Sequence, residues 1–256
     1  MMDKILDSLK AAEGKIGFYY KNLVTGKEIG FNENKIFLAA SVIKLPVLAE
    51  VFRQWSLENV DMSETITVKN EDKMPSCGAL NLFTNEPSVD IRTLCRLMIT
   101  LSDNTATNVL INRFGIDKLN SGFLEIGFKD TKISRLLFDA EAQKQGKENV
   151  IVPKEIGILL EQIYCKSFVN EKISTEINEI LLEQQINHKI PGKLPEDVKV
   201  AHKTGEDDGI TNDVGIVYSG TPFIIVFASN DANVPEFEHL IREISYQCYI
   251  YNQKLA

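Results

Sequence analysis

Strand-forming sequence stands near both ends of this chain, whereas the long middle part has the periodicity of helices. Two strands are predicted at residues 15–21 and 27–32, joined by a hairpin turn around Thr25-Gly26. Toward the other end, apolar runs with a turn at Ser219-Gly220 predict three more strands, at residues 199–203, 213–218 and 222–228. We therefore expect strands from both chain ends to share one antiparallel sheet.

The middle of the chain, residues 41–185, is predicted to be helical. Asp90 and Pro153 stand where helices begin, and a last helix is expected at residues 233–251. This order predicts one α+β domain over residues 1–256, with helices on the sheet and an all-helical subdomain. The expected parts are an α/β part at about residues 1–40 and 190–256 and a helical part at about residues 41–189.

The charge balance limits the partners of the chain. Its 256 residues carry a formal net charge of −8, which argues against nucleic acid, because phosphate binding needs a basic face. No apolar run approaches the roughly 20 residues that span a bilayer. Residues 1–10 resemble an amphipathic helix and lack the features of a secretory signal, so we expect a cytoplasmic protein, or an exported one if the sequence is a mature form. We also expect a monomer.

Three short motifs are expected where the helical part joins the sheet: Ser41-Val42-Ile43-Lys44, Ser102-Asp103-Asn104 and Lys203-Thr204-Gly205. One such motif would mean little, because serine and lysine are common residues. Each occurs once, however, and together they predict a site for nucleophilic catalysis at a junction where clefts form.

Ser41 and Lys44 have the spacing of a nucleophile and its base. They are three residues apart, so on a first helical turn both lie on one face. Pro46 places Ser41 at or before that turn, since proline in a helix interior costs about 3 kcal/mol, and the free N–H groups there favour a developing alkoxide. Lys44 can serve as the base if burial and a nearby cation, for which Lys203 is the candidate, lower its pKa from about 10.4.

Ser102 and Asn104 can act on the amide that is cleaved. Ser102 can relay a proton to the leaving nitrogen, and Asn104 can donate to a substrate carbonyl and accept from a substrate N–H. Asp103 is expected to cap the helix that follows.

The last motif is expected on a strand that borders the site. Lys203 and Thr204 would bind a substrate carboxylate, and Gly205 would leave room for a substrate along the strand. The backbone N–H groups of Ser41 and Glu206 are the predicted oxyanion-hole pair.

The chain resembles class A serine β-lactamases and related serine hydrolases in three segments: S-V-I-K, L-M-I-T-L-S-D-N-T-A-T-N and K-T-G-E-D-D-G-I-T-N-D-V-G. The resemblance covers nearly the whole chain, and it implies that the α+β domain has a β-lactamase/transpeptidase-like fold. It implies an acyl-enzyme at Ser41, formed from a β-lactam or an acyl-D-alanine-like amide, and it implies no cofactor. The remaining groups that it places in the site are Lys44, Ser102, Asn104, Lys203, Thr204, Gly205 and Glu206.

The resemblance is weakest on the loop after the S-D-N helix. There the family has E-x-x-L-N, whose glutamate activates the water that hydrolyses the acyl-enzyme. Glu141 lies close to the expected place, and Gln145 stands where the family has asparagine. Glu141 is therefore predicted as a catalytic residue, with Asp139 as a rival and Glu148 as a weaker one, or with all three on a solvated loop.

Three functions follow from these motifs. The first is a β-lactamase that acylates at Ser41 and releases the acid. The second is a penicillin-binding or esterase-like relative that acylates but deacylates slowly, and the third is a non-enzymatic sensor of β-lactam-type ligands. We expect no metal site, because the four cysteines and the histidines, among them His188 and His239, have no partners at ligand spacing.

Overall fold

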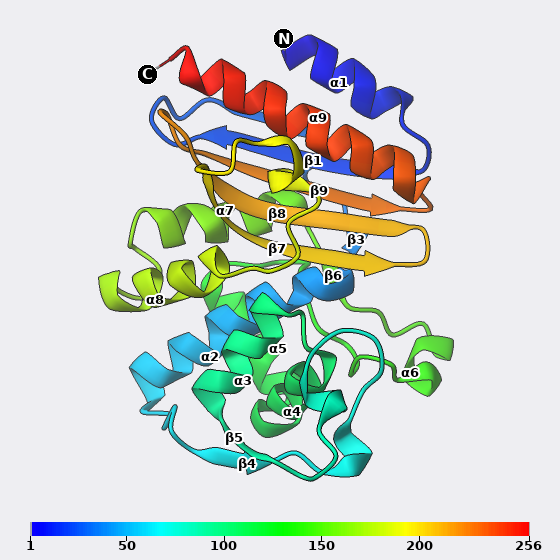
Figure 1. Cartoon of the computed structure of the whole chain (residues 1–256), viewed down its shortest axis with the longest axis vertical. Helices are drawn as coiled ribbons and strands as arrows, with labels where there is room; N and C mark the ends of the chain where they lie inside the picture. The colour runs from blue at the N-terminus through cyan, green and yellow to red at the C-terminus, as the bar shows by residue number, and fades with distance from the viewer. Residues whose placement is uncertain (1, 256) are drawn as a thin grey trace.

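The computed structural model describes residues 2–255 and places one five-stranded antiparallel sheet between two layers of helices (Figure 1). Its strands are β1 (Lys15–Asn22), β2 (Glu28–Phe31), β7 (Lys199–Asp207), β8 (Ile210–Tyr218) and β9 (Phe223–Asn230). They lie in the order β2-β1-β9-β8-β7. β1 pairs with β9 along its whole length, so the two chain ends meet inside the sheet. The predicted α+β class and the shared antiparallel sheet are confirmed.

Helices cover both faces of this sheet (Figure 1). α1 (Met2–Ala11) and α9 (Val234–Gln253) lie on one face, and α7 (Pro153–Tyr164) and α8 (Glu171–Leu182) lie on the other. Strand β8 is buried at every residue but its last, which follows from having a layer of helices on each side.

The helical part packs around α2 (Lys44–Glu58), in which every residue from Lys44 to Phe52 is buried. The 3₁₀ helix η1 (Ala40–Ile43) leads into α2 and carries Ser41. Helices α3 (Ile91–Thr100), α4 (Asn104–Phe114), α5 (Ile116–Ile126) and α8 contact α2. The helical part also contains the short α6 (Ala140–Lys144) and the 3₁₀ helices η2 (Asn70–Asp72) and η3 (Leu80–Leu82), and the last two contact α4.

Short strands that the sequence pattern did not reveal pair in two small sheets. They are β3 (Phe37–Leu38) with β6 (Val150–Ile151), and β4 (Thr65–Thr67) with β5 (Ser88–Asp90). Strands of two or three residues are too short for a period to be visible in the sequence. The β3–β6 pair ties the segment before Ser41 to the segment after α6.

The predicted helix starts agree with the structure. The side chain of Asp90 accepts the backbone N–H of Thr93 at the start of α3, and Pro153 is the first residue of α7. α9 begins after Asn233 and extends past the predicted end to Gln253. No helix within residues 2–255 is long and apolar enough to cross a bilayer.

A buried asparagine near the end of α9 joins that helix to the sheet. Asn252 Oδ1 accepts from Asn22 Nδ2 at 2.6 Å and from Tyr20 Oη at 3.1 Å, and Asn252 Nδ2 donates to the carbonyl of Cys248 at 2.7 Å. All of these side chains are buried.

We predict that Asn252→Ala lowers the free energy of unfolding by about 2–3 kcal/mol, because it leaves buried donors of β1 without an acceptor. Urea unfolding measures this. The control is Gln253→Ala, whose side chain is exposed on the same turn and whose effect should stay within about 0.5 kcal/mol. Equal effects of the two substitutions would contradict the prediction.

Candidate active site

The side chains of two lysines converge on Ser102, between α2, α4 and β7. Lys44 Nζ donates to Ser102 Oγ at 3.0 Å, to the Ser102 carbonyl at 2.7 Å and to Asn104 Oδ1 at 2.8 Å. Lys203 Nζ donates to the same Ser102 Oγ at 3.0 Å. The structure thus brings together four of the predicted site residues, here called the Ser102 cluster: Lys44, Ser102, Asn104 and Lys203.

The Ser102 cluster is almost closed to water, which changes the charge state of its lysines. Lys44 and Lys203 have no exposed surface. Burial lowers the pKa of Lys203 from its usual value to about 7, with the Asp213 carboxylate opposing this shift and the Lys189 ammonium adding to it. Burial, and then the charge of Lys203, hold the pKa of Lys44 well below its usual value. The lowered pKa favours the neutral form of Lys44, which is the form that a general base needs.

Ser102 occupies a backbone conformation that non-glycine residues rarely adopt. Its φ is 52°, in the left-handed region, which costs an L-residue roughly 1–2 kcal/mol. Asp103 holds this turn: its carboxylate accepts the N–H groups of Ala79, Leu80 and Ala106. The expected helix cap at Asp103 is confirmed, and the carboxylate also fixes the facing loop.

Gly205 lies against the backbone that carries the nucleophile. A Cβ at Gly205 would lie 3.0 Å from the backbone nitrogens of Ser41 and Val42 and 3.1 Å from the Ala39 carbonyl oxygen. The sequence suggested that glycine leaves room for substrate here. In the structure the missing side chain leaves room for η1, so the first and third motifs meet through their backbones. Ser41 itself is partly exposed.

Comparison with known proteins identifies the family of the chain. The model of the Beta-lactamase2 family, described as a β-lactamase enzyme family, matches residues 1–252. The chain belongs to the β-lactamase enzyme family. Membership in this family supports the prediction that the protein is a hydrolase.

Relatives in the family align over most of the chain. A β-lactamase of Mycobacterium tuberculosis is 25% identical over 91% of this chain and 78% of its own length, and β-lactamase VEB-1 of Pseudomonas aeruginosa is 26% identical over 94% and 87%. Among solved structures, PBP-A superposes with a TM-score of 0.89 at 26% identity, covering 98% of this chain and 95% of that chain. A β-lactamase of Sphaerobacter thermophilus shares the fold, with a TM-score of 0.87 at 24% identity over 95% and 94%.

The acidic residues of the loop bind partners on that loop. Glu141 is 79% exposed, and its carboxylate lies 2.8 Å from Lys144 Nζ. Asp139 caps α6 by accepting the N–H of Ala142, and Glu148 pairs with Arg135 at 2.9 Å. Within residues 2–255, none of the three carboxylates hydrogen-bonds to the Ser102 cluster. The catalytic role of Glu141 stays a prediction.

Leu137 of the same loop is hydrogen-bonded through its backbone to the S-D-N helix. Asn108 Oδ1 accepts the N–H of Leu137 at 2.9 Å, and Asn108 Nδ2 donates to the Leu137 carbonyl at 3.0 Å. Asn108 lies four residues after Asn104, on the same face of α4. The loop therefore approaches this face of α4 at Leu137, which sequence reasoning missed because the contact joins an interior helix residue to a loop.

The predicted isolation of His188 is wrong. His188 Nε2 lies 3.4 Å from the carboxylates of Glu206 and Glu238, which come from β7 and α9. Distant segments meet here, so sequence spacing gave no sign of the group. Lys189 Nζ lies 3.0 Å from the same Glu206 oxygen, so an ammonium group already neutralises that carboxylate.

His202 has partners that the sequence did not reveal. Its Nδ1 lies 2.9 Å from Asp213 Oδ1, and its Nε2 lies 2.9 Å from Asn187 Oδ1. Because Asn187 Nδ2 donates to the Gln184 carbonyl, Oδ1 is the atom that faces the ring. Both ring nitrogens therefore face acceptors, and the buried imidazole joins β7 to β8 and to the segment before Lys189.

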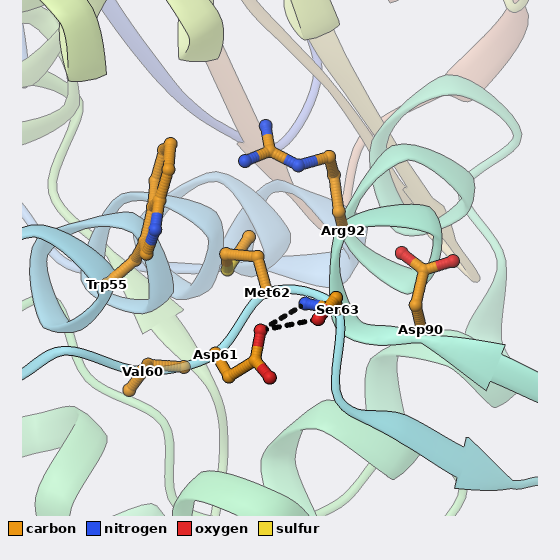
Figure 2. A pocket seen from close by; sticks show the side chains of 7 residues that line it. All are labelled: Trp55, Val60, Asp61, Met62, Ser63, Asp90 and Arg92. Carbon is orange, nitrogen blue, oxygen red and sulfur yellow. Dashed lines mark hydrogen bonds between the residues drawn. The ribbon is translucent and has the colours of Figure 1, made fainter.

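A pocket of about 360 Å³ lies apart from the Ser102 cluster, between the end of α2 and the start of α3 (Figure 2). Trp55 on its wall lies about 16 Å along α2 from Lys44 at 1.5 Å per residue. Arg92 and Lys172 each lie 4.6 Å from the Trp55 ring centre, and the Asp61 carboxylate accepts from Ser63. The polar groups named here already have partners within the protein.

We predict that Gly205→Ala slows acylation of this family member by penicillin-G roughly 100-fold, the cost of displacing one oxyanion donor. The added Cβ would push β7 away from the Ser41 and Val42 backbone. Stopped-flow acylation measures the rate, and thermal melting checks that the fold persists. A variant that melts like wild type and acylates at the wild-type rate would contradict the prediction.

Proposed function

We propose that the protein is a serine hydrolase that opens β-lactam rings through an acyl-enzyme at Ser41. The observation that carries this proposal is the pair of buried lysines, Lys44 and Lys203, that both bind Ser102 Oγ at 3.0 Å. Family membership supports it, as do the β-lactamases among the relatives and a variant of PBP-A solved as its acyl-enzyme with penicillin-G, which is 26% identical to this chain.

In the proposed acylation, Ser41 Oγ bonds to the lactam carbonyl carbon and its proton passes to neutral Lys44. The carbonyl oxygen, now negative, is stabilised by the backbone N–H groups of Ser41 and Glu206. When the carbonyl re-forms, the ring C–N bond breaks and the nitrogen takes a proton from Ser102, which Lys44 re-protonates. Ser102 Oγ accepts hydrogen bonds from Nζ of both Lys44 and Lys203, so its own O–H is free to donate outward.

The remaining polar groups would hold the substrate. Lys203 and Thr204 would bind the carboxylate of a β-lactam or of an acyl-D-alanine-like amide. Asn104 Nδ2 donates one hydrogen to the Pro75 carbonyl at 3.0 Å, which leaves the second for a substrate carbonyl. Hydrolysis then requires a water that attacks the ester carbon and gives its proton to a base.

The first half of the cycle is tested by intact-mass spectrometry. After mixing with penicillin-G, wild type should gain one penicillin mass and Ser41→Ala none, because the ester oxygen is missing. Ser41→Cys serves as the matched control, since a thiolate can also be acylated. An adduct on Ser41→Ala, or none on wild type, would refute the proposal.

A second candidate, acylation with slow release, is favoured by the loop. The residue fastened by Asn108 next to the S-D-N helix is Leu137, which has no group to activate water. The predicted base, Glu141, is exposed and paired with Lys144. On this reading the acyl-enzyme persists, as in a penicillin-binding or esterase-like protein.

The lifetime of the adduct separates the two candidates. Under slow release, the adduct on wild type persists for hours, Leu137→Glu shortens its lifetime at least 10-fold by supplying a base, and Glu141→Gln leaves it unchanged. The matched control Leu137→Gln has the same size without the base. Rapid turnover that Glu141→Gln abolishes would instead establish Glu141 as the base and the protein as a β-lactamase.

A further inference from the structure

A third buried lysine, Lys189, lies outside the three motifs and contacts the backbone of β7 and β8. Lys189 has no exposed surface and stands just before the 3₁₀ helix η4 (Ile190–Lys193). Its Nζ donates to the carbonyl oxygens of Gly205 and Asn212, both at 3.2 Å, and lies 3.0 Å from Glu206 Oε1. A buried ammonium group costs several kcal/mol unless it is paired, and here all three of its hydrogens have acceptors.

The two carbonyls that Lys189 binds belong to one rung of the sheet. Gly205 on β7 is opposite Asn212 on β8. Asn212 Nδ2 donates in turn to the carbonyls of Leu38 and Ala39, on the segment that enters η1. Gly205 faces the Ser41 nitrogen. Lys189 therefore holds the Gly205–Asn212 pair, against which the backbone of Ser41 packs.

Lys189 also contributes charge to the cluster. The groups that act on Lys203 come from every side of it: Asp213 on β8, Glu206 on β7, Cys77 on the facing loop, and the ammonium groups of Lys44 and Lys189. Asp213, Glu206 and Cys77 raise the pKa of Lys203, whereas Lys189 lowers it.

Building on the proposed function, we propose that Lys189 is a positioning residue of the acyl-transfer site. It fixes the Gly205–Asn212 rung behind Ser41 and places an additional positive charge beside Lys203. The first effect acts on the rate of acylation, and the second acts on the pH at which Lys203 gives up its proton.

The sign of the second effect follows from the charges. Lys203 is protonated below its pKa of about 7, so its attraction for a substrate carboxylate fades as the pH rises through that value. Removing the Lys189 charge raises the pKa of Lys203. Acylation by a carboxylate-bearing β-lactam should then persist to higher pH.

The test measures the second-order rate constant for acylation by penicillin-G between about pH 5 and 10. This range extends to both sides of the Lys203 pKa of about 7. For Lys189→Met we expect a fall of about 10-fold at pH 7 from misplacement of the rung, and a rise of about one unit in the pH at which the rate declines. Lys189→Gln keeps a donor without the charge, so it should show the same shift with a smaller fall. Lys193→Met, on the same segment with an exposed side chain paired to Glu243, should match wild type.

For a fourth variant we expect the pH at which the rate declines to shift in the opposite direction. Glu206→Gln removes a charge that raises the pKa of Lys203, so the decline should move to lower pH, an effect that loss of packing alone does not produce. If Lys189→Met does not fold, Lys189→Gln and Glu206→Gln carry the test. A decline that stays at the wild-type pH in the folded variants overturns the inference. Absence of any adduct on wild type refutes the proposed function instead, so the two failures are distinguishable.

Discussion

The removal of lysine ammonium groups from water is the constraint on which this site depends. Lys44 of the first motif and Lys203 of the third both bind Ser102 Oγ. Neither lysine has exposed surface. Two like charges beside one oxygen repel each other, and burial strengthens that repulsion. Loss of a proton relieves it, so the packing that buries the lysines also provides an amine that can act as a base.

The sheet supplies the rigid support for this arrangement. Because β1 and β9 pair along their whole length, the order of the strands places β7 at an edge. The 3₁₀ helix η1 packs against this edge strand. Gly205 allows η1 to approach this edge, and Lys189 and the Asn212 side chain hold the Gly205–Asn212 pair in place against the segment before η1. Ser41 is thus positioned by backbone contacts from several segments of the chain.

The loop after α5, which carries Glu141, is held by a different set of contacts. Its polar side chains are satisfied within the loop: Glu141 by Lys144, Glu148 by Arg135, and Asp139 by the N-terminus of α6. The backbone of Leu137 attaches the loop to Asn108 on the S-D-N helix. The groups that we propose for acylation are therefore held by the core, while the carboxylates predicted for hydrolysis belong to a loop that is held by other contacts.

The sequence by itself determined the fold class, the strands at both chain ends, the helix starts at Asp90 and Pro153, and the three motifs. These are local properties: periodicity, capping and short spacing can be recognised without knowing which segments meet. Only the tertiary structure decided the partners of His188 and His202, the contact of Asn108 with Leu137, and the place of Lys189 behind Gly205. Each of these contacts joins elements that are distant along the chain, and a side chain's burial and partners depend on how those elements pack.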